Sequence, residues 1–128
     1  MLKSKIHRAT ITDCDLHYAG SITLDPELMH AADLLANEHV HVLDIDNGER
    51  FETYVIEGTP GSAEVQINGA AARLVHTGDR VIIVSYGLYE KDEIDRHEPR
   101  VVHVDTDNQI IRVDADPTTV PTENGRRP

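Results

Sequence analysis

Cysteine is almost absent from this sequence, because its 128 residues contain only one, Cys14. A single cysteine excludes an intramolecular disulfide and any zinc or iron–sulfur site built from several cysteines. Long apolar runs are missing too. No stretch approaches the roughly 20 residues that a membrane-spanning helix needs, and the N-terminal segment lacks the apolar stretch of a signal peptide. We therefore expect a reduced, cytoplasmic protein without a membrane partner, in which Cys14 is a free thiol.

Positive charge is also scarce. The chain has 12 Lys and Arg residues against 23 Asp and Glu residues, which gives a formal net charge of −11. This charge repels a phosphate backbone, so nucleic acid is not an expected partner and a DNA-binding barrel is disfavoured. The cations are unevenly placed, since Lys3, Lys5 and Arg8 precede the first acid, Asp13. This basic segment and Arg50 are the candidates for contacts with an anionic small molecule.

Length and composition favour one domain followed by a tail. A chain of 128 residues can bury one hydrophobic core. From Ala115 onward the sequence has three prolines, Gly125 and no hydrophobic periodicity. We expect a single folded domain over residues 1–114 and a disordered C-terminal tail over residues 115–128.

Short stretches of strand character, separated by turn signals, dominate the domain. Residues 13–20 are expected to form a loop, and Asn47-Gly48 a two-residue type I′ hairpin turn, in which both central positions need a positive φ. Six to eight short strands with few helices favour a small closed β-barrel, which would leave no exposed sheet edge. The expected strands cover residues 3–12, 21–24, 39–46, 50–57, 63–67, 79–86, 101–104 and 109–113.

One helix is expected over about residues 26–36. Asp25 is a suitable N-cap, Pro26 suits the first helical position, and Glu27 complements the helix dipole. Apolar residues then follow at helical spacing. A turn at residues 68–72 is expected to enter about one further helical turn.

Four sequence blocks go beyond this description of the fold. They are Lys5-x-His7-Arg8, Asp15-Leu16-His17-Tyr18-x-Gly20-Ser21, Asn47-Gly48-x-Arg50-Phe51-x-Thr53-Tyr54 and Asn68-Gly69-Ala70-Ala71-Ala72. In this order, without gaps over about residues 1–87, they closely resemble the aspartate 1-decarboxylase family. These pyruvoyl-dependent enzymes convert L-aspartate to β-alanine and CO₂ for pantothenate and coenzyme A biosynthesis. The resemblance implies a double-psi β-barrel and a homotetramer with active sites between subunits.

The resemblance also implies that the chain cuts itself between Gly20 and Ser21, into residues 1–20 and 21–128. The Ser21 hydroxyl attacks the preceding carbonyl to give an ester, and β-elimination and hydrolysis then leave a pyruvoyl group on residue 21. Glycine at position 20 would permit a strained backbone and close approach to the carbonyl. Thr53 matches the family residue that stabilises the oxyanion. Outside this context, a Gly-Ser dipeptide is usually an ordinary turn.

In this family, the covalent pyruvoyl group takes the place of pyridoxal phosphate. The substrate amine forms an imine with its ketone, and electrons from the breaking Cα–CO₂ bond flow into the adjoining amide carbonyl. Tyr54 matches the residue proposed as the proton donor to Cα, since a phenol is protonated at neutral pH. Without the resemblance, Tyr54 would be interpreted as a half-buried strand aromatic.

Substrate binding is expected to use cations and one turn. Lys5 and Arg50 match the pair that binds the two carboxylates of L-aspartate; Arg50 can bind bidentately, whereas Lys5 is a point charge. The resemblance adds further residues to the pocket. They are Thr53, the turn residues Asn68, Gly69, Ala70 and Ala71, and the supporting residues His7 and Tyr18.

One geometric problem follows from the strand assignment. Neighbouring residues on a regular strand point to opposite faces, so Thr53 and Tyr54 cannot both line one pocket. Either the strand is bulged there, or the pocket lies where the strand ends or meets another subunit. The sequence leaves both options open.

No metal site or metal cofactor is expected. His39 and His41 share one strand face, but no third ligand is evident at a useful spacing. The competing hypothesis to an enzyme is a non-enzymatic β-barrel module that binds an anionic small molecule or a protein through the basic N-terminal segment. It predicts a permanently intact chain and no release of CO₂.

Overall fold

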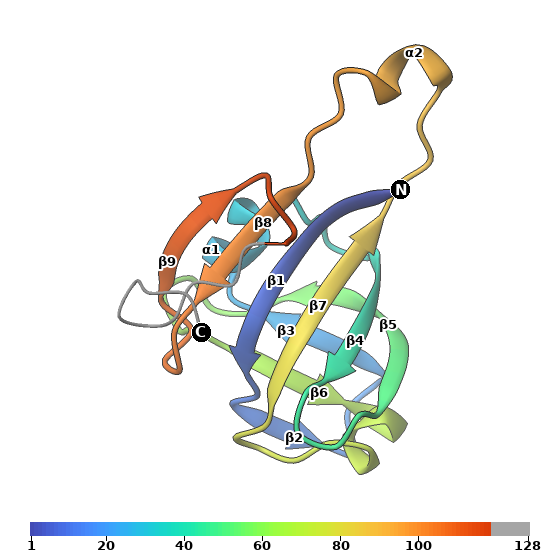
Figure 1. Cartoon of the computed structure of the whole chain (residues 1–128). Helices are drawn as coiled ribbons and strands as arrows, with labels where there is room; N and C mark the ends of the chain where they lie inside the picture. The colour runs from blue at the N-terminus through green and yellow to red at the C-terminus, as the bar shows by residue number, and fades with distance from the viewer. Residues whose placement is uncertain (119–128) are drawn as a thin grey trace.

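The computed structural model describes residues 1–118, and its nine strands form one mixed sheet (Figure 1). The mainly β prediction is therefore confirmed, with one strand more than the expected maximum of eight. The strands are β1 (Leu2–Thr10), β2 (Asp13–Asp15), β3 (Ser21–Leu24), β4 (His39–Asp44), β5 (Arg50–Glu57), β6 (Val65–Asn68), β7 (Arg80–Tyr86), β8 (Arg100–Val104) and β9 (Ile110–Asp114).

The helices are short: α1 (Pro26–Ala31), the 3-10 helix η1 (Gly69–Arg73) and α2 (Lys91–Ile94). α2, which the sequence did not predict, lies on a segment that projects away from the sheet (Figure 1). Over residues 1–118, no helix has the length and apolar character that crossing a bilayer requires.

The strand order is β2-β6-β3-β5-β4-β7-β1-β8-β9, so most neighbours in the sheet are not neighbours in the sequence. The β1–β8, β2–β6 and β3–β5 pairs are parallel, and the other pairs are antiparallel. Side chains from distant strands meet in one core, among them the fully buried Ile6, Ile22, Val40, Val55 and Ile67. This order places β3, which begins at Ser21, between β6 and β5.

α1 ends at Ala31, not at residue 36 as predicted. Asp33 has a φ of 55°, in the left-handed region, and the Leu34 N–H bonds to the Met29 carbonyl at 2.8 Å. Such a left-handed residue commonly terminates a helix, but it is usually a glycine. The helix end was missed because Asp33 carries no such signal in the sequence.

The predicted loop over residues 13–20 is also wrong in part, because Asp13–Asp15 form β2. This short strand pairs in parallel with β6, with Asp15 beside Asn68. Three polar residues that depend on a distant strand for pairing carry no alternating pattern. Only the remaining residues, 16–20, connect β2 to β3 without a strand.

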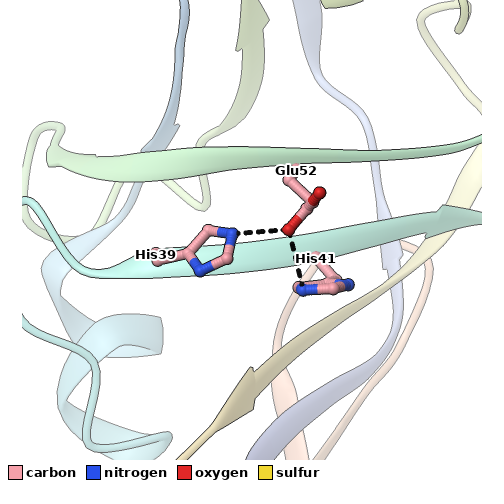
Figure 2. A group of neighbouring side chains, drawn as sticks. All are labelled: His39, His41 and Glu52. Carbon is pink, nitrogen blue, oxygen red and sulfur yellow. Dashed lines mark hydrogen bonds and ion pairs between the residues drawn. The ribbon is translucent and has the colours of Figure 1, made fainter.

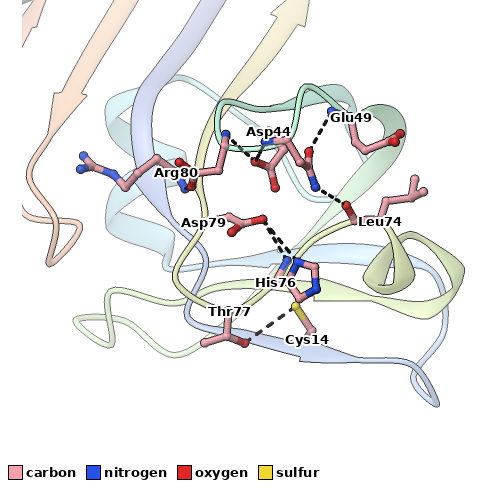
Figure 3. A network of polar contacts seen from close by, with 10 residues as sticks. Cys14, Asp44, Glu49, Leu74, His76, Thr77, Asp79 and Arg80 are labelled. Carbon is pink, nitrogen blue, oxygen red and sulfur yellow. Dashed lines mark hydrogen bonds and ion pairs between the residues drawn. The ribbon is translucent and has the colours of Figure 1, made fainter.

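The turn between β4 and β5 is longer than the predicted two-residue type I′ turn. Only Gly48 has a positive φ there, at 78°, and its N–H bonds to the Asp44 carbonyl at 2.9 Å. The Asp44 carboxylate accepts the Asp46 N–H at 2.8 Å, and the Asn47 side chain donates to the Leu74 carbonyl at 2.8 Å. This network (Figure 3) fixes a five-residue loop and shifts the pairing of the two strands.

Buried and exposed residues alternate imperfectly along β1 because the strand is irregular at Arg8. The pairing register shifts between His7 and Ala9, and Arg8 between them has a φ of 66°. This irregularity lets Ile6, His7 and Ala9 all be buried. The side chain of Arg80 donates to the Arg8 carbonyl, with an Nε–O distance of 2.8 Å.

The domain boundary predicted at residue 114 coincides with the end of β9. Residues 115–118 are exposed, and the Lys5 Nζ donates to the Pro117 carbonyl at 3.1 Å. The rest of the predicted disordered tail, residues 119–128, lies outside the described residues.

Candidate active site

Ser21 lies where an exposed loop enters a buried strand. Gly20 is exposed, whereas Ser21, the first residue of β3, is only 1% exposed. The Ser21 hydroxyl donates to the Ala19 carbonyl, with an oxygen–oxygen distance of 3.0 Å. The Gly20–Ser21 linkage is therefore open to solvent on one side, while the hydroxyl beside it is held inside the protein.

Asn68 fixes this hydroxyl from the opposite strand. It is fully buried and pairs with Ser21 in the antiparallel β3–β6 register. Its Nδ2 donates to Ser21 Oγ at 3.0 Å and to Thr23 Oγ1 at 2.9 Å, while its Oδ1 accepts from Gln66 Nε2 at 2.7 Å. Because both amide protons and the carbonyl are used, the orientation of Asn68 is defined.

Thr23 and Gln66 are two members of this network that sequence reasoning missed. Each lies two residues from a predicted site residue, Thr23 from Ser21 and Gln66 from Asn68. Residues two apart on a strand share a face, but the β3–β6 register that brings these four side chains together is visible only in the structure.

Gly69 packs directly against the backbone of Gly20, the residue before Ser21. Its φ is +75°, and a Cβ at this position would lie 2.7 Å from Gly20 Cα and 2.9 Å from Gly20 N. At Gly20, by contrast, a Cβ would meet no atom within 4 Å, and its φ is not among the positive values. The backbone of Gly20 therefore lacks the left-handed φ that would require glycine, and the close contact with a distant segment requires glycine at position 69.

The structure shows whether β5 is bulged at Thr53 and Tyr54, which is one of the two options that the sequence leaves open. Thr53 pairs with Val40 and Tyr54 with His39, without a register shift, so β5 is not bulged there. The two side chains therefore point to opposite faces. The option that remains is a pocket at a strand end or a subunit boundary.

Tyr54 occupies the β5 position alongside Ser21. Ile22 pairs with Val55 in the parallel β3–β5 ladder, and Ser21 and Tyr54 come one step earlier on their strands. Aligned residues of neighbouring strands share a face, so this register assigns Tyr54 to the face of Ser21. Tyr54 is 40% exposed, which leaves its phenol accessible to a small molecule.

Lys5 and His7 lie on β1, and three strands separate β1 from β3 in the sheet order. Burial lowers the pKa of Lys5, and the charge of Asp114 opposes that change. Burial, followed by the charges of Lys5 and His103, lowers the pKa of His7 from 6.5 to about 4. The strand order of one chain thus leaves these two predicted pocket residues away from Ser21.

The remaining predicted residues lie near the surface. Arg50 opens β5 on the same strand face as Tyr54, and it is exposed. Tyr18 is 51% exposed, and its carbonyl oxygen lies 3.3 Å from where a Cβ on Gly69 would stand. Ala70 is exposed and Ala71 is half-buried, both at the start of η1. The chain therefore gathers Ser21, Asn68, Gly69 and Tyr54, with the small residues of η1 following directly.

The basic N-terminal segment is already engaged within the chain. Lys3 Nζ forms an ion pair with Glu38 Oε2 at 2.8 Å and also donates to the Asp33 carbonyl. With Lys5 bound to the Pro117 carbonyl, two of its three cations have internal partners. This arrangement weakens the hypothesis of a binding module that uses the segment.

Cys14 lies outside the Ser21 network. The Thr77 hydroxyl donates to its sulfur at 3.8 Å (Figure 3), and burial raises the pKa of the thiol. A raised pKa keeps the thiol protonated at neutral pH, which makes it a poor nucleophile. This agrees with the expectation of a free thiol without a catalytic role.

His39 and His41 do have a third potential ligand nearby, which is Glu52. The expectation that no third ligand lies within reach of the two histidines is therefore wrong. His41 pairs directly with Glu52 across the β4–β5 ladder. A tight two-residue turn would have paired Glu52 with Leu43. The five-residue turn changes the register, and no residue pattern at Asn47-Gly48 indicates that change.

Most of the chain matches a known protein family. The sequence model of a decarboxylase family matches residues 1–111, which include β1 to β8 and all the predicted site residues. The chain is accordingly a decarboxylase. The family is that of aspartate decarboxylase, and the chain belongs to it.

Two solved structures of designed proteins are also similar to this chain. The computationally designed msDPBB_sym2 protein is 19% identical, covers 59% of this chain and 95% of its own, and has a TM-score of 0.47. The rationally designed mkDPBB_sym_86 protein is 14% identical, covers 63% of this chain and 95% of its own, and has a TM-score of 0.48. Both TM-scores are below 0.5, and the mainly β architecture rests on the strand order and register of the chain itself.

Proposed function

We propose that this chain is a self-processing L-aspartate 1-decarboxylase that produces β-alanine and CO₂ for pantothenate and coenzyme A biosynthesis. Family membership supports decarboxylation of L-aspartate. The observation that carries the self-processing part is the buried Ser21 hydroxyl, which Asn68 holds at 3.0 Å beneath the Gly69 turn.

The processing reaction begins with the chain's own atoms. Ser21 Oγ bonds to the Gly20 carbonyl carbon, the C–N bond of that linkage breaks, and the hydroxyl proton passes to the freed amine. β-Elimination then removes the Ser21 Cα proton and breaks the Cβ–Oγ bond, which releases residues 1–20 with a carboxylate end, and a proton from solvent is added at Cβ. Water replaces the nitrogen of residue 21 and ammonia leaves, so that residue 21 ends as a pyruvoyl group.

The residues around Ser21 fit this group. Residue 21 supplies its carbon atoms, the exposed Gly20 can leave into solvent, and the buried Asn68 amide remains beside the new group. When present, the pyruvoyl group supplies the electron sink that decarboxylation requires, without pyridoxal phosphate or a metal.

The chain's own side chains would bind the substrate and move the proton. Arg50 offers a bidentate partner for one carboxylate of L-aspartate, and the Tyr54 phenol delivers a proton to Cα as CO₂ departs. The Asn68–Ala71 turn presents small side chains and backbone N–H groups beside the substrate amine. Thr53 points to the other face of β5, so its role as an oxyanion donor in processing rests on the family resemblance alone.

The positions of Lys5 and His7 in the sheet favour a pocket formed by more than one chain. Because β5, β4 and β7 separate them from Ser21 in the sheet order, a pocket containing all three is most simply completed by a neighbouring chain. We therefore include a homotetramer with active sites between subunits in the proposal. Light scattering of the purified protein would give four chains per particle, and a monomer active at assay concentration would contradict the assembly.

Intact-mass spectrometry combined with product analysis tests the enzymatic proposal. We expect two chains, residues 1–20 and residues 21–128 with a blocked N-terminus, and formation of β-alanine from L-aspartate. An uncut chain that still forms β-alanine would contradict the cofactor assignment. An uncut chain without CO₂ release would favour the non-enzymatic binding module instead.

A further inference from the structure

Three side chains with metal-ligating atoms gather on the β4–β5 strand pair, on the face that also carries Arg50 and Tyr54. His39 and His41 come from β4 and Glu52 from β5 (Figure 2). Glu52 Oε1 lies 2.9 Å from His39 Nε2 and 3.2 Å from His41 Nε2. One ligand atom from each residue lies within 4.8 Å of the others. The carboxylate oxygen therefore points between the two imidazoles.

This donor set and its spacing suit zinc. Two histidine nitrogens and one glutamate oxygen, with water as a fourth ligand, form a known type of tetrahedral zinc site. Zinc–ligand distances of about 2.0–2.1 Å place tetrahedral ligand atoms about 3.3 Å apart. The present contacts from Glu52 Oε1 need to widen by only a few tenths of an ångström to admit an ion.

The backbone holds the three ligands in place. His41 pairs with Glu52 on one side and with Val84 of β7 on the other, so β4 is an interior strand of the sheet. The His41 ring also packs edge-on against Tyr86, with ring centroids 5.3 Å apart. A site built on paired strands is positioned more precisely than one built on loops.

The site is also accessible. The side chains of His39, His41 and Glu52 are 65%, 38% and 61% exposed. Solvent can therefore deliver an ion and supply the fourth ligand.

A second cluster, Asp44, Asp46 and Asp79, is a weaker candidate. Its carboxylates already accept backbone N–H groups, among them those of Asp46, His76 and Arg80. Its all-oxygen donor set also suits harder cations than zinc. The two clusters therefore differ both in the availability of their atoms and in their chemistry.

We propose that His39, His41 and Glu52 bind one Zn²⁺ ion per chain, with water completing a tetrahedral site. The site is independent of the proposed processing at Ser21, since it shares no residue with that network.

A competition titration tests this proposal on the purified, chelator-treated full chain. Zn²⁺ is added in the presence of a chromophoric zinc indicator, and Co²⁺ is used separately for its tetrahedral absorption bands. We expect one ion per chain and intense cobalt bands. Each of the variants His39→Gln, His41→Gln and Glu52→Gln should weaken zinc binding by at least about tenfold.

The matched control is the double variant His17→Gln/His30→Gln, which removes two exposed histidines outside the cluster. It should bind zinc with unchanged affinity, and circular dichroism should show the same fold for every variant. Failure of the wild-type chain to compete with the indicator would overturn the proposal. So would a folded His39→Gln/His41→Gln variant that still binds one ion as tightly as wild type.

Discussion

The chain contains the same dipeptide twice, as Gly20–Ser21 and as Gly61–Ser62, and the two copies differ in every respect that matters for chemistry. Ser21 is 1% exposed and its hydroxyl is bound by a buried side-chain amide. Ser62 is exposed, and within residues 1–118 its hydroxyl accepts the N–H of Glu64 at 3.2 Å. The first hydroxyl is held beside its own peptide linkage, whereas the second belongs to a surface loop.

The second copy is nevertheless well anchored, but through its backbone. The Asp25 carboxylate accepts the Gly61 N–H at 3.1 Å and the Ala63 N–H at 2.8 Å, and it also caps α1. Order alone therefore does not distinguish the two serines. The difference is the buried amide of Asn68, which has no counterpart in the hydrogen bonds of Ser62 described above.

The largest expected effect comes from removing each hydroxyl in turn. Ser21→Ala should abolish cleavage and β-alanine formation completely, because the nucleophile and the source of the pyruvoyl group are lost. Ser62→Ala should cleave and turn over like wild type. Intact mass and β-alanine yield check both variants. Cleavage in Ser21→Ala, or its loss in Ser62→Ala, would reverse the assignment.

Removing the amide that distinguishes the two sites comes next. Asn68→Ala leaves the hydroxyls of Ser21 and Thr23 without their buried donor, which costs about 1–3 kcal/mol. Cleavage should slow by at least about tenfold, since the Ser21 hydroxyl is no longer fixed. The rate is measured by following the uncut chain over time on gels.

Asn108→Ala is the control for buried-asparagine loss in general. Asn108 is 4% exposed, and its side chain donates to the Thr10 and Ala63 carbonyls at 2.9 Å. Its loss should lower the free energy of unfolding by at least as much, because Asn108 also has a φ of 60° that alanine adopts at a cost, but it should leave the cleavage rate unchanged. Equal slowing in both variants would mean that stability, not the Asn68 contact, controls cleavage.

The contrast between the two dipeptides also shows how far sequence reasoning reaches. β5 was predicted with its observed bounds, Arg50–Glu57, because an alternating strand of eight residues carries a strong local pattern. Ser21, Asn68 and Gly69 were singled out through a resemblance, and the structure brings them together. The local pattern of a Gly-Ser pair, by itself, would not have separated residue 21 from residue 62.

What the sequence could not supply is register. The β3–β6 pairing that adds Thr23 and Gln66 to the site, and the β4–β5 pairing that adds Glu52 to two histidines, join residues from different strands. Cross-strand pairing depends on turn geometry, and the β4–β5 turn is longer than its Asn-Gly signal indicates. The close approach at Gly69 was missed for the same reason, since its neighbour Gly20 lies on another segment.

A third pair of variants tests that close approach. Gly69 and Gly61 have nearly the same φ, +75° and +78°, but a Cβ on Gly61 would meet no atom within 4 Å. Gly61→Ala should therefore cost only the left-handed backbone term, about 1 kcal/mol. Gly69→Ala adds an overlap with the Gly20 backbone, which raises the loss of stability to about 2–4 kcal/mol.

Cleavage gives a second measurement on the same pair. Gly69→Ala should slow cleavage several-fold because the 20–21 linkage is displaced, while Gly61→Ala should cleave like wild type. Chemical denaturation gives the stability difference and gel analysis gives the rate. Equal stability losses in the two variants would show that the close approach is relieved without cost.

The smallest expected effect is the pH dependence of folding stability. It matters for the comparison because the two dipeptides can be compared only while the chain is folded. Burial and neighbouring cations lower the pKa of His7 from 6.5 to about 4. Its ring nitrogens have no hydrogen-bond partner among the described residues. As pH falls, the unfolded chain therefore protonates His7 before the folded chain does, and His7 removes stability between about pH 6.5 and 4.

Asp44 acts in the opposite direction, because burial and a hydrogen bond with Asp79 raise its pKa from 3.8 to about 6. Its folded form takes up the proton first, which adds stability as pH falls from about 6 to 3.8.

The two contributions overlap in pH and partly cancel, so single variants should separate them. The pKa values of His103, Glu38 and Asp114 are also lowered and act in the same direction as His7, so each variant is compared with the uncut Ser21→Ala background. Adding Asp44→Asn should increase the loss of stability as pH falls from 6.5 to 4 by about 2 kcal/mol. Adding His7→Gln should decrease that loss by a similar amount. Denaturant unfolding at several pH values measures both slopes. Parallel profiles for the two variants would contradict the opposed assignment. Opposite changes in the two variants, relative to their shared background, would assign one contribution to His7 and the other to Asp44.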